Sequence, residues 1–223
     1  MTWPAVRWQR LTDYMLVVAT LVEAAVFAGI APGFFSVGNA ANIALSIAVT
    51  GILAVGMTAV ILTAGIDLSV GSVVALTGVT GAMAAAHGVM PAWAALVAAV
   101  LVGTATGVVN GTLTAYLQVP AFVSTLAMLT IARGLAFIVS GGRSIGDLPS
   151  SFGALGRSVL LGIPAPVLVM AAVMIAGAFV LRRTVFGRHI YAIGGNTEAA
   201  WLAGVNTKRV IWWVYVLNGA LAG

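Results

Sequence analysis

Long runs of apolar residues, separated by short polar or glycine-rich breaks, fill most of the chain. Between Ala24 and Ala132, Asp67 is the only charged residue. The uncharged runs on both sides of Asp67 exceed the roughly 20 residues that one helix needs to cross the hydrocarbon core of a bilayer. A transmembrane β-barrel would instead show alternation over about ten residues. The pattern therefore predicts an all-α, polytopic membrane protein.

The breaks divide the chain into seven expected membrane segments within one transmembrane domain, residues 1–223. The segments lie near residues 13–31, 43–64, 72–87, 91–117, 120–140, 164–181 and 210–223. The third is the least regular of them and is expected to be short or broken. A polar, glycine-rich loop at 141–162 precedes the sixth segment, and a basic loop at 182–209 follows it.

Composition agrees with this prediction. The chain is 61% hydrophobic and 7% charged, and its mean hydropathy is +1.13, whereas a soluble domain has about 25% charged residues. The net charge of +5 could suggest nucleic-acid binding, but the basic residues cluster in short regions, as they do at the cytoplasmic face of membrane proteins. We therefore expect no nucleic-acid partner. The chain has no Cys, which excludes a disulfide framework or a thiolate metal site.

The basic residues also predict how the chain crosses the membrane, because short loops rich in Lys and Arg stay in the cytoplasm. With the N-terminus inside, six crossings return the 182–209 loop to the cytoplasm. Arg143 and Arg157 then lie outside. The inside residues are Arg7, Arg10, Arg182, Arg183, Arg188, Lys208 and Arg209. We expect a cytoplasmic N-terminus with Trp3 and Trp8 as an interfacial anchor rather than a cleaved signal peptide.

The break around Asp67 is the first candidate site. A carboxylate in hydrocarbon is costly, so Asp67 must face protein, water or a helix end. Gly65 can end one helix, and Asp67 can cap the next by accepting N–H bonds near Ser69 and Val70. Broken helices at membrane depth are tolerated where they are buried or line a cavity. Asp67 and Ser69 are therefore candidates for a cap of the broken helix, which is favoured, or for contact with the solute in the translocation pathway. Ion coupling by Asp67 is the least favoured role.

A second candidate is a row of small residues on the fourth segment. Gly103, Gly107 and Gly111 recur every four residues, which places them on one helix face. Such rows let helices approach closely in membranes. We expect packing within one subunit in preference to a dimer contact. Asn110, beside the row, can bond across helices or face the pathway.

The remaining polar groups within the apolar segments are few. Glu23 is expected to face the helix bundle or the outer interface, and Arg133 to pair within the protein. His87, Ser69 and Ser72 show no nucleophile–base spacing. We therefore expect no catalytic residue, no metal site and no cofactor bound by this chain.

The basic loop carries signals for a short helix. Asn196 or Thr197 can cap its start, Glu198 suits its first turn, and Gly204 suits the residue after its end. Gly194–Gly195 would allow a sharp turn before it. A helix of under two turns is marginal in water, so it needs a surface on its own chain or on a partner. A Walker sequence is absent, and nucleotide binding is not expected here.

These stretches together resemble the permeases of ribose-type ATP-binding-cassette importers, the family that also contains xylose, arabinose and galactose permeases. The resemblance covers most of the chain from about residue 35. The matching stretches are Gly56–Thr58, Ile66–Ser72, Ala132–Gly134, Ser140–Gly142, Phe186–Arg188, Ala192–Asn196, Ala199–Ala200 and Gly204–Val205.

The resemblance implies a type II-like importer permease fold in a bacterial inner membrane. It also implies a second permease copy, a periplasmic or extracellular sugar-binding protein, and a cytoplasmic ATPase that holds the ATP and Mg²⁺. The 186–205 stretch would contain the coupling helix that fits the ATPase. The implied coupling residues are Gly187, Arg188, Gly194, Gly195, Asn196, Glu198, Ala199, Ala200 and Gly204. Family members are about a third longer, and this chain stops within an apolar run, so we expect that C-terminal helices are missing.

Other functions remain open at this point. The nearest is a permease for branched-chain amino acids or nucleosides from the same broader group. A secondary transporter that uses Asp67 or Glu23 for ion coupling would have inverted repeats and would need no ATPase. An intramembrane enzyme is the least favoured of the three.

Overall fold

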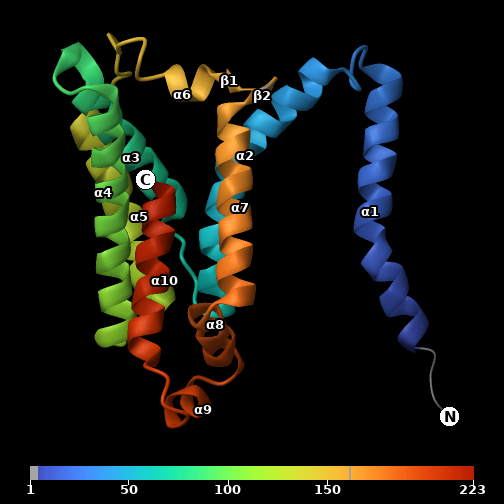
Figure 1. Ribbon diagram of the computed structural model, residues 1–223, viewed down its shortest axis with the longest axis vertical. Coiled ribbons are helices and arrows are strands. Elements are labelled where there is room, and N and C mark those ends of the chain that lie inside the picture. The colour runs from blue at the N-terminus through green and yellow to red at the C-terminus, as the bar shows by residue number, and fades with distance from the viewer. Residues whose placement is uncertain (1–4, 161) are drawn as a thin grey trace. The chain divides into compact units, whose positions relative to one another are not determined.

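The computed structural model describes residues 5–160 and 162–223 (Figure 1). Trp3, one half of the predicted anchor, lies outside these residues. The side chains of Trp8 and His87 lie outside what the structure describes. The longer helices are α1 (Ala5–Ile30), α2 (Val37–Leu62), α3 (Val70–Ala85), α4 (Ala92–Gly111), α5 (Ala121–Ser140), α7 (Ala165–Arg183), α8 (Val185–Gly195) and α10 (Thr207–Ala222). The shorter ones are α6 (Ala154–Arg157) and α9 (Thr197–Leu202). The all-α prediction is confirmed.

Four of the described helices are long and apolar enough to cross a membrane: 37–62, 92–116, 121–140 and 165–183. They correspond to the second, fourth, fifth and sixth predicted segments. The apolar parts of α1 and α3 are shorter, at Val17–Ile30 and Val70–Ala85. α3, which the sequence predicted to be short or broken, ends in a 3₁₀ turn at Ala86–Gly88.

The chain divides into two compact units, residues 1–46 and 47–223. The first contains α1 and the start of α2. Between these helices, Ser36 Oγ accepts a bond from the N–H of Asn39 at 3.1 Å, and the Asn39 amide donates to the Phe34 carbonyl at 2.7 Å. These bonds fix the turn into α2. Glu23 is exposed on α1 within this unit.

In the second unit, α3 packs against α4 and α5, and α10 lies along α4 (Figure 1). The glycine row of α4 forms the seam with α10. A Cβ on Gly107 would lie 3.0 Å from Val216 Cα, and one on Gly111 would lie 3.0 Å from the Trp212 carbonyl. From the other side, a Cβ on Gly219 would lie 2.8 Å from Gly107 N. The row therefore packs within this chain, backbone against backbone.

The fourth predicted segment is not a uniform helix. α4 passes at Gly111 into a π-helical turn, Thr112–Tyr116, and the N–H of Leu117 reaches the Thr112 carbonyl at 3.1 Å. Trp212 Nε1 on α10 donates to Thr112 Oγ1 at 3.0 Å. Gln118 then takes a positive φ of 54° before α5 begins. The wider turn thus keeps contact with α10 where the α-helix ends.

Two predicted loops have more structure than expected. The 141–162 stretch contains α6 and the strand β1 (Val159–Leu160), which pairs antiparallel with β2 (Ile163–Pro164). The 182–209 stretch is mostly helical, because α8 fills the part that the sequence analysis left as loop. The apolar residues of α8 do recur at helical spacing, with Ile190 and Ile193 buried, but its three glycines are poor helix formers and favoured a loop.

Candidate functional site

The break between α2 and α3 places Asp67 inside the second unit, where its side chain is 6% exposed. Asp67 Oδ1 accepts bonds from the backbone N–H of Ser69 at 2.9 Å and from Ser69 Oγ at 2.6 Å. Its other oxygen, Oδ2, accepts a bond from Asn218 Nδ2 on α10 at 2.8 Å. Three donors therefore satisfy the carboxylate, as a buried charge requires.

Asn110 on α4 completes what we call the buried polar cluster: Asp67, Ser69, Asn110 and Asn218. Asn110 Nδ2 donates to Ser69 Oγ at 3.1 Å. Both Asn110 and Asn218 are 1% exposed. The cluster thereby joins α4, the break and α10, and it brings together the three residues that the sequence analysis chose as pathway or cap candidates.

Asn218 was missed in the sequence analysis. The signal was available, because Asn218 is a polar residue inside the apolar run 210–223, and such residues usually pair within the bundle. Its side chain also lies against α2, where a Cβ on Gly56 would be 3.3 Å from Asn218 Cγ. Gly56 therefore lets α2 and α10 approach at the level of the cluster.

The start of the break differs from the sequence prediction. Ala64, with φ of 57°, takes the left-handed conformation that was expected of Gly65. The N–H of Gly65 then bonds to the Val60 carbonyl at 3.0 Å, which closes α2. Gly65 serves close approach instead, since a Cβ there would lie 2.9 Å from Tyr215 Oη. That hydroxyl donates to the Ile66 carbonyl at 3.1 Å.

As the sequence predicts, Asp67 accepts the backbone N–H of Ser69 at the start of α3. Ser69 is the residue before the helix, and it makes no side-chain cap bond to the first turn. Asp67 acts one step earlier, by holding Ser69 through two hydrogen bonds. In this conformation the described residues leave no space for a water molecule between Asp67, Asn110 and Asn218. The hydrogen bonds of Asp67 join the break between α2 and α3 to α10.

Arg133, which was expected to pair, is exposed on α5. It makes no hydrogen bond or ion pair with any part of the chain that the structure describes. The pairing expected from the sequence is therefore not seen among the described residues.

The second candidate region is the pair α8 and α9. Thr184 Oγ1 accepts a bond from the N–H of Gly187 at 3.1 Å and so caps α8. Gly187 is buried against the last turn of α7, where a Cβ would lie 2.6 Å from Leu181 Cα. Ile190 and Ile193 of α8, which are 0% and 1% exposed, pack in the hydrophobic core.

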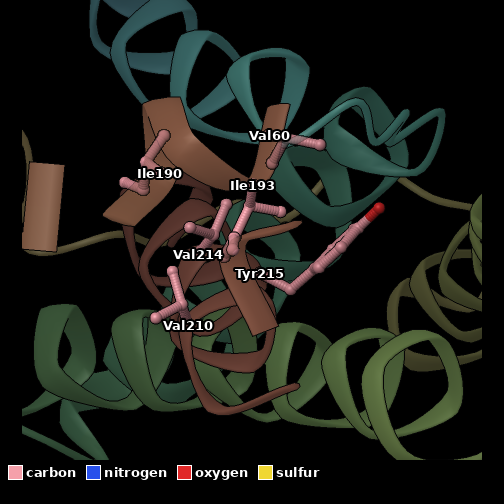
Figure 2. Packing of buried hydrophobic residues seen from close by; sticks show 7 residues of the cluster. Val60, Ile190, Ile193, Val210, Val214 and Tyr215 are labelled. Carbon is pink, nitrogen blue, oxygen red and sulfur yellow. The ribbon is translucent and has the colours of Figure 1, made fainter. Parts of the chain in front are cut away.

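Figure 2 shows this core. Ile190 and Ile193 of α8 converge with Val60 of α2 and with Val214 and Tyr215 of α10. The Tyr215 hydroxyl points away from the aliphatic side chains, toward the break between α2 and α3. The same core thus fixes α8 and supports the site at Asp67.

α9 has the caps that its sequence predicts. Asn196 Oδ1 accepts a bond from the N–H of Ala199 at 2.9 Å, and Glu198 lies in the first turn. At the other end Gly204 has a φ of +87°, and the N–H of Val205 bonds to the Ala200 carbonyl at 3.0 Å. These bonds satisfy the ends of a helix too short to be stable alone.

The turn before α9 is at Asn196, with φ −161° and ψ 106°, whereas Gly194 and Gly195 are the last residues of α8. The sequence analysis expected the turn at the two glycines. Gly194 is required for packing, because a Cβ there would meet the Leu62 carbonyl at the end of α2.

α9 presents two different faces. Ala200 is 5% exposed and belongs to the core cluster. Trp201 and Leu202 are 64% and 74% exposed. Any partner that α9 contacts would therefore meet Trp201 and Leu202, while Ala200 holds the helix on its own chain.

The basic residues of this region are Arg182, Arg183, Arg188, Lys208 and Arg209, and each is exposed. Glu198 is the one acidic residue in the 182–209 stretch. α9 and its flanks therefore form a positively charged surface with two large apolar side chains at its end.

A family model described as "Branched-chain amino acid transport system / permease component" matches residues 39–223. The ribose import permease protein RbsC of Haemophilus influenzae is 39% identical over 92% of this chain and 66% of its own length. RbsC of Escherichia coli is 40% identical over 95% of this chain and 67% of its own. The L-arabinose ABC transporter permease protein AraH of Azospirillum brasilense is 37% identical over 97% and 63%.

The chain thus spans about two thirds of the length of the curated relatives it matches. No solved structure matches it. The resemblance inferred from the motifs is confirmed, and the chain belongs to the family of branched-chain amino acid transport system permease components, among relatives that are sugar import permeases.

Proposed function

We propose that this chain is a transport subunit of an ATP-driven importer for a monosaccharide of the ribose, arabinose or allose kind. Relatives at 33–40% identity over nearly the whole chain are permeases for ribose, L-arabinose and D-allose, which supports the sugar class over amino acids or nucleosides. In this proposal the subunit has no chemistry of its own. A partner ATPase binds the ATP and Mg²⁺, and a separate binding protein delivers the sugar.

The geometry of α9 is the observation that carries the proposal of an ATPase partner. A helix of six residues is capped at both ends, held to the core by Ala200, and leaves Trp201 and Leu202 exposed. A hollow of about 320 Å³ lies beside Trp201, bordered by Gly204 and Lys208. Exposed Trp and Arg side chains are enriched among the residues that dominate binding at protein interfaces.

The proposal places α9 and the N-terminus in the cytoplasm of a bacterium, with the helices in its inner membrane and a second permease copy beside this one. The charge distribution supports this orientation, since five of the ten Lys and Arg residues lie in the 182–209 stretch. The loop at 141–162 would then face the binding protein.

A co-purification experiment tests the proposal. The chain is expressed with the ATPase encoded beside it, in wild-type form and as Leu202→Glu. Leu160→Glu is the matched control, because Leu160 is also exposed, at 61%, and lies on β1 at the opposite end of the second unit (Figure 1). We expect Leu202→Glu to lose the ATPase and Leu160→Glu to retain it.

Retention of the ATPase by Leu202→Glu would contradict docking at α9. Absence of binding by wild type, both in this chain and in one extended to the length of the relatives, would contradict an ATP-driven importer. If wild type binds the ATPase, the sugar can be identified by measuring ATP-dependent uptake of ribose, arabinose and allose into vesicles that also contain the binding protein.

A further inference from the structure

A groove lies in the second unit where α2, α7 and α8 meet. Its volume is about 240 Å³. Its walls are apolar over most of its length and include Val55 on α2 with Met174, Gly177 and Ala178 on α7. Arg182 and Tyr191 lie among the lining residues at the α8 end.

Small residues create this groove. Gly177 faces α2, where a Cβ would lie 2.5 Å from Val55 Cγ1, so the two helices touch at this level. Ala178 beside it leaves the groove open. Thr58, the one hydroxyl in the apolar part, donates to the Ala54 carbonyl of its own helix at 2.6 Å. The apolar part of the groove therefore offers no free donor to a polar ligand.

The α8 end has the opposite character. Arg182 lies in the last turn of α7, and Tyr191 is 50% exposed on α8. Arg183 and Arg188 lie nearby in sequence, and no carboxylate of the described chain forms a salt bridge with these three arginines. Arginine and tyrosine at a helix end are typical of the membrane interface, where they meet lipid headgroups.

α7 is also the candidate span with the least burial within the described residues. None of its apolar window is buried in the described structure, whereas the other three spans are buried over 17–28% of theirs. An occupant of the groove must therefore match an apolar wall along a membrane helix and a cation with a phenol at the interface. An acyl chain joined to an anionic headgroup has both properties.

We propose that the groove binds an anionic phospholipid. One acyl chain lies along Val55, Gly177 and Met174, and the phosphate accepts hydrogen bonds from the Arg182 guanidinium and the Tyr191 hydroxyl. The lipid belongs to the leaflet on the basic side of the chain. This site does not depend on which solute the protein carries.

Native mass spectrometry of the purified full chain tests the proposal. The protein is mixed with equal amounts of phosphatidylglycerol and phosphatidylcholine with the same acyl chains, and the retained ratio is measured. We expect wild type to prefer phosphatidylglycerol and Arg182→Gln to lower that preference by about fivefold or more, because the variant loses a charge-assisted hydrogen bond to the phosphate. Arg183→Gln, which removes the same charge from the same turn outside the groove, should lower the preference by less than about twofold, because it removes no hydrogen bond to the phosphate.

A second pair of variants tests the apolar part. Ala178→Phe fills the groove and should lower retention of phosphatidylglycerol, whereas Ala172→Phe, an exposed position on another face of α7, should not. Equal loss of preference in Arg182→Gln and Arg183→Gln would overturn the proposal in favour of diffuse charge attraction. No preference in wild type would also overturn it. A third result would also overturn the proposal: Ala178→Phe abolishes a dimer in the same spectra and leaves lipid retention unchanged. The occupant of the groove would then be a helix of a second copy.

Discussion

Asp67 obtains its three hydrogen bonds from two parts of the chain that are far apart in sequence. Two come from Ser69 and one from Asn218, 151 residues away. The two bonds from Ser69 fix the conformation of the break between α2 and α3, and the bond from Asn218 connects the break to α10. A carboxylate in this position stabilises the fold only while all its donors are present, because an unpaired buried charge costs more than the bond contributes.

Replacing Asn218 with Leu tests this dependence. The variant removes the donor to Asp67 Oδ2 and leaves a buried acceptor unsatisfied, which costs about 1–3 kcal/mol or more for a charged group. We expect a matching fall in the free energy of unfolding measured in detergent. Asn42→Leu, an exposed position on α2, should change stability by less than about 0.5 kcal/mol. Equal stability of the two variants would show that Asp67 does not need α10.

The glycine seam gives a second prediction for single residues. Gly107→Ala places a methyl group against the backbone of α10, and overpacking of this kind costs about 1–3 kcal/mol. Gly134→Ala is the matched control, since Gly134 is also helical and has no atom within 4 Å of an added Cβ. We expect the thermal midpoint to fall for Gly107→Ala and to hold or rise for Gly134→Ala.

At the scale of elements, α9 separates a residue that holds the helix from residues that face outward. Ala200→Glu buries an unpaired charge in the core, which costs at least about 2 kcal/mol. Leu202→Glu changes an exposed side chain. We expect Ala200→Glu to lower the unfolding midpoint and Leu202→Glu to leave it unchanged. If both variants were equally stable, Ala200 would not anchor α9.

Helix boundaries were predictable where local chemistry marks them. Pro91 and Pro120 each precede a helix, and Gly141 ends α5 in the left-handed conformation. The caps of α9 were also readable from Asn196 and Gly204. Tertiary packing decided the rest: Ala64 takes a positive φ because Gly65 is needed beside Tyr215, a contact across 150 residues that no local pattern reveals.

At the scale of the whole molecule, the predicted orientation can be tested directly because the chain has no Cys. Leu160 and Leu202 are both exposed, so each can be replaced by a single cysteine, as Leu160→Cys and Leu202→Cys. We expect a membrane-impermeant maleimide to label Leu160→Cys in intact spheroplasts and to label Leu202→Cys only after the membrane is opened. The reverse pattern would place the basic stretch outside.

The backbone-to-backbone seam between α4 and α10 has a mechanical consequence. Gly107 and Gly219 leave no rotatable side chain between the two helices, so one cannot slide along the other without losing contact. α2 and α7 meet through side chains, at Val55 and at Met170, and the unbranched Met170 can change rotamer. We therefore expect α10 and α4 to move together in any rearrangement of the second unit, and α2 and α7 to shift more readily against each other.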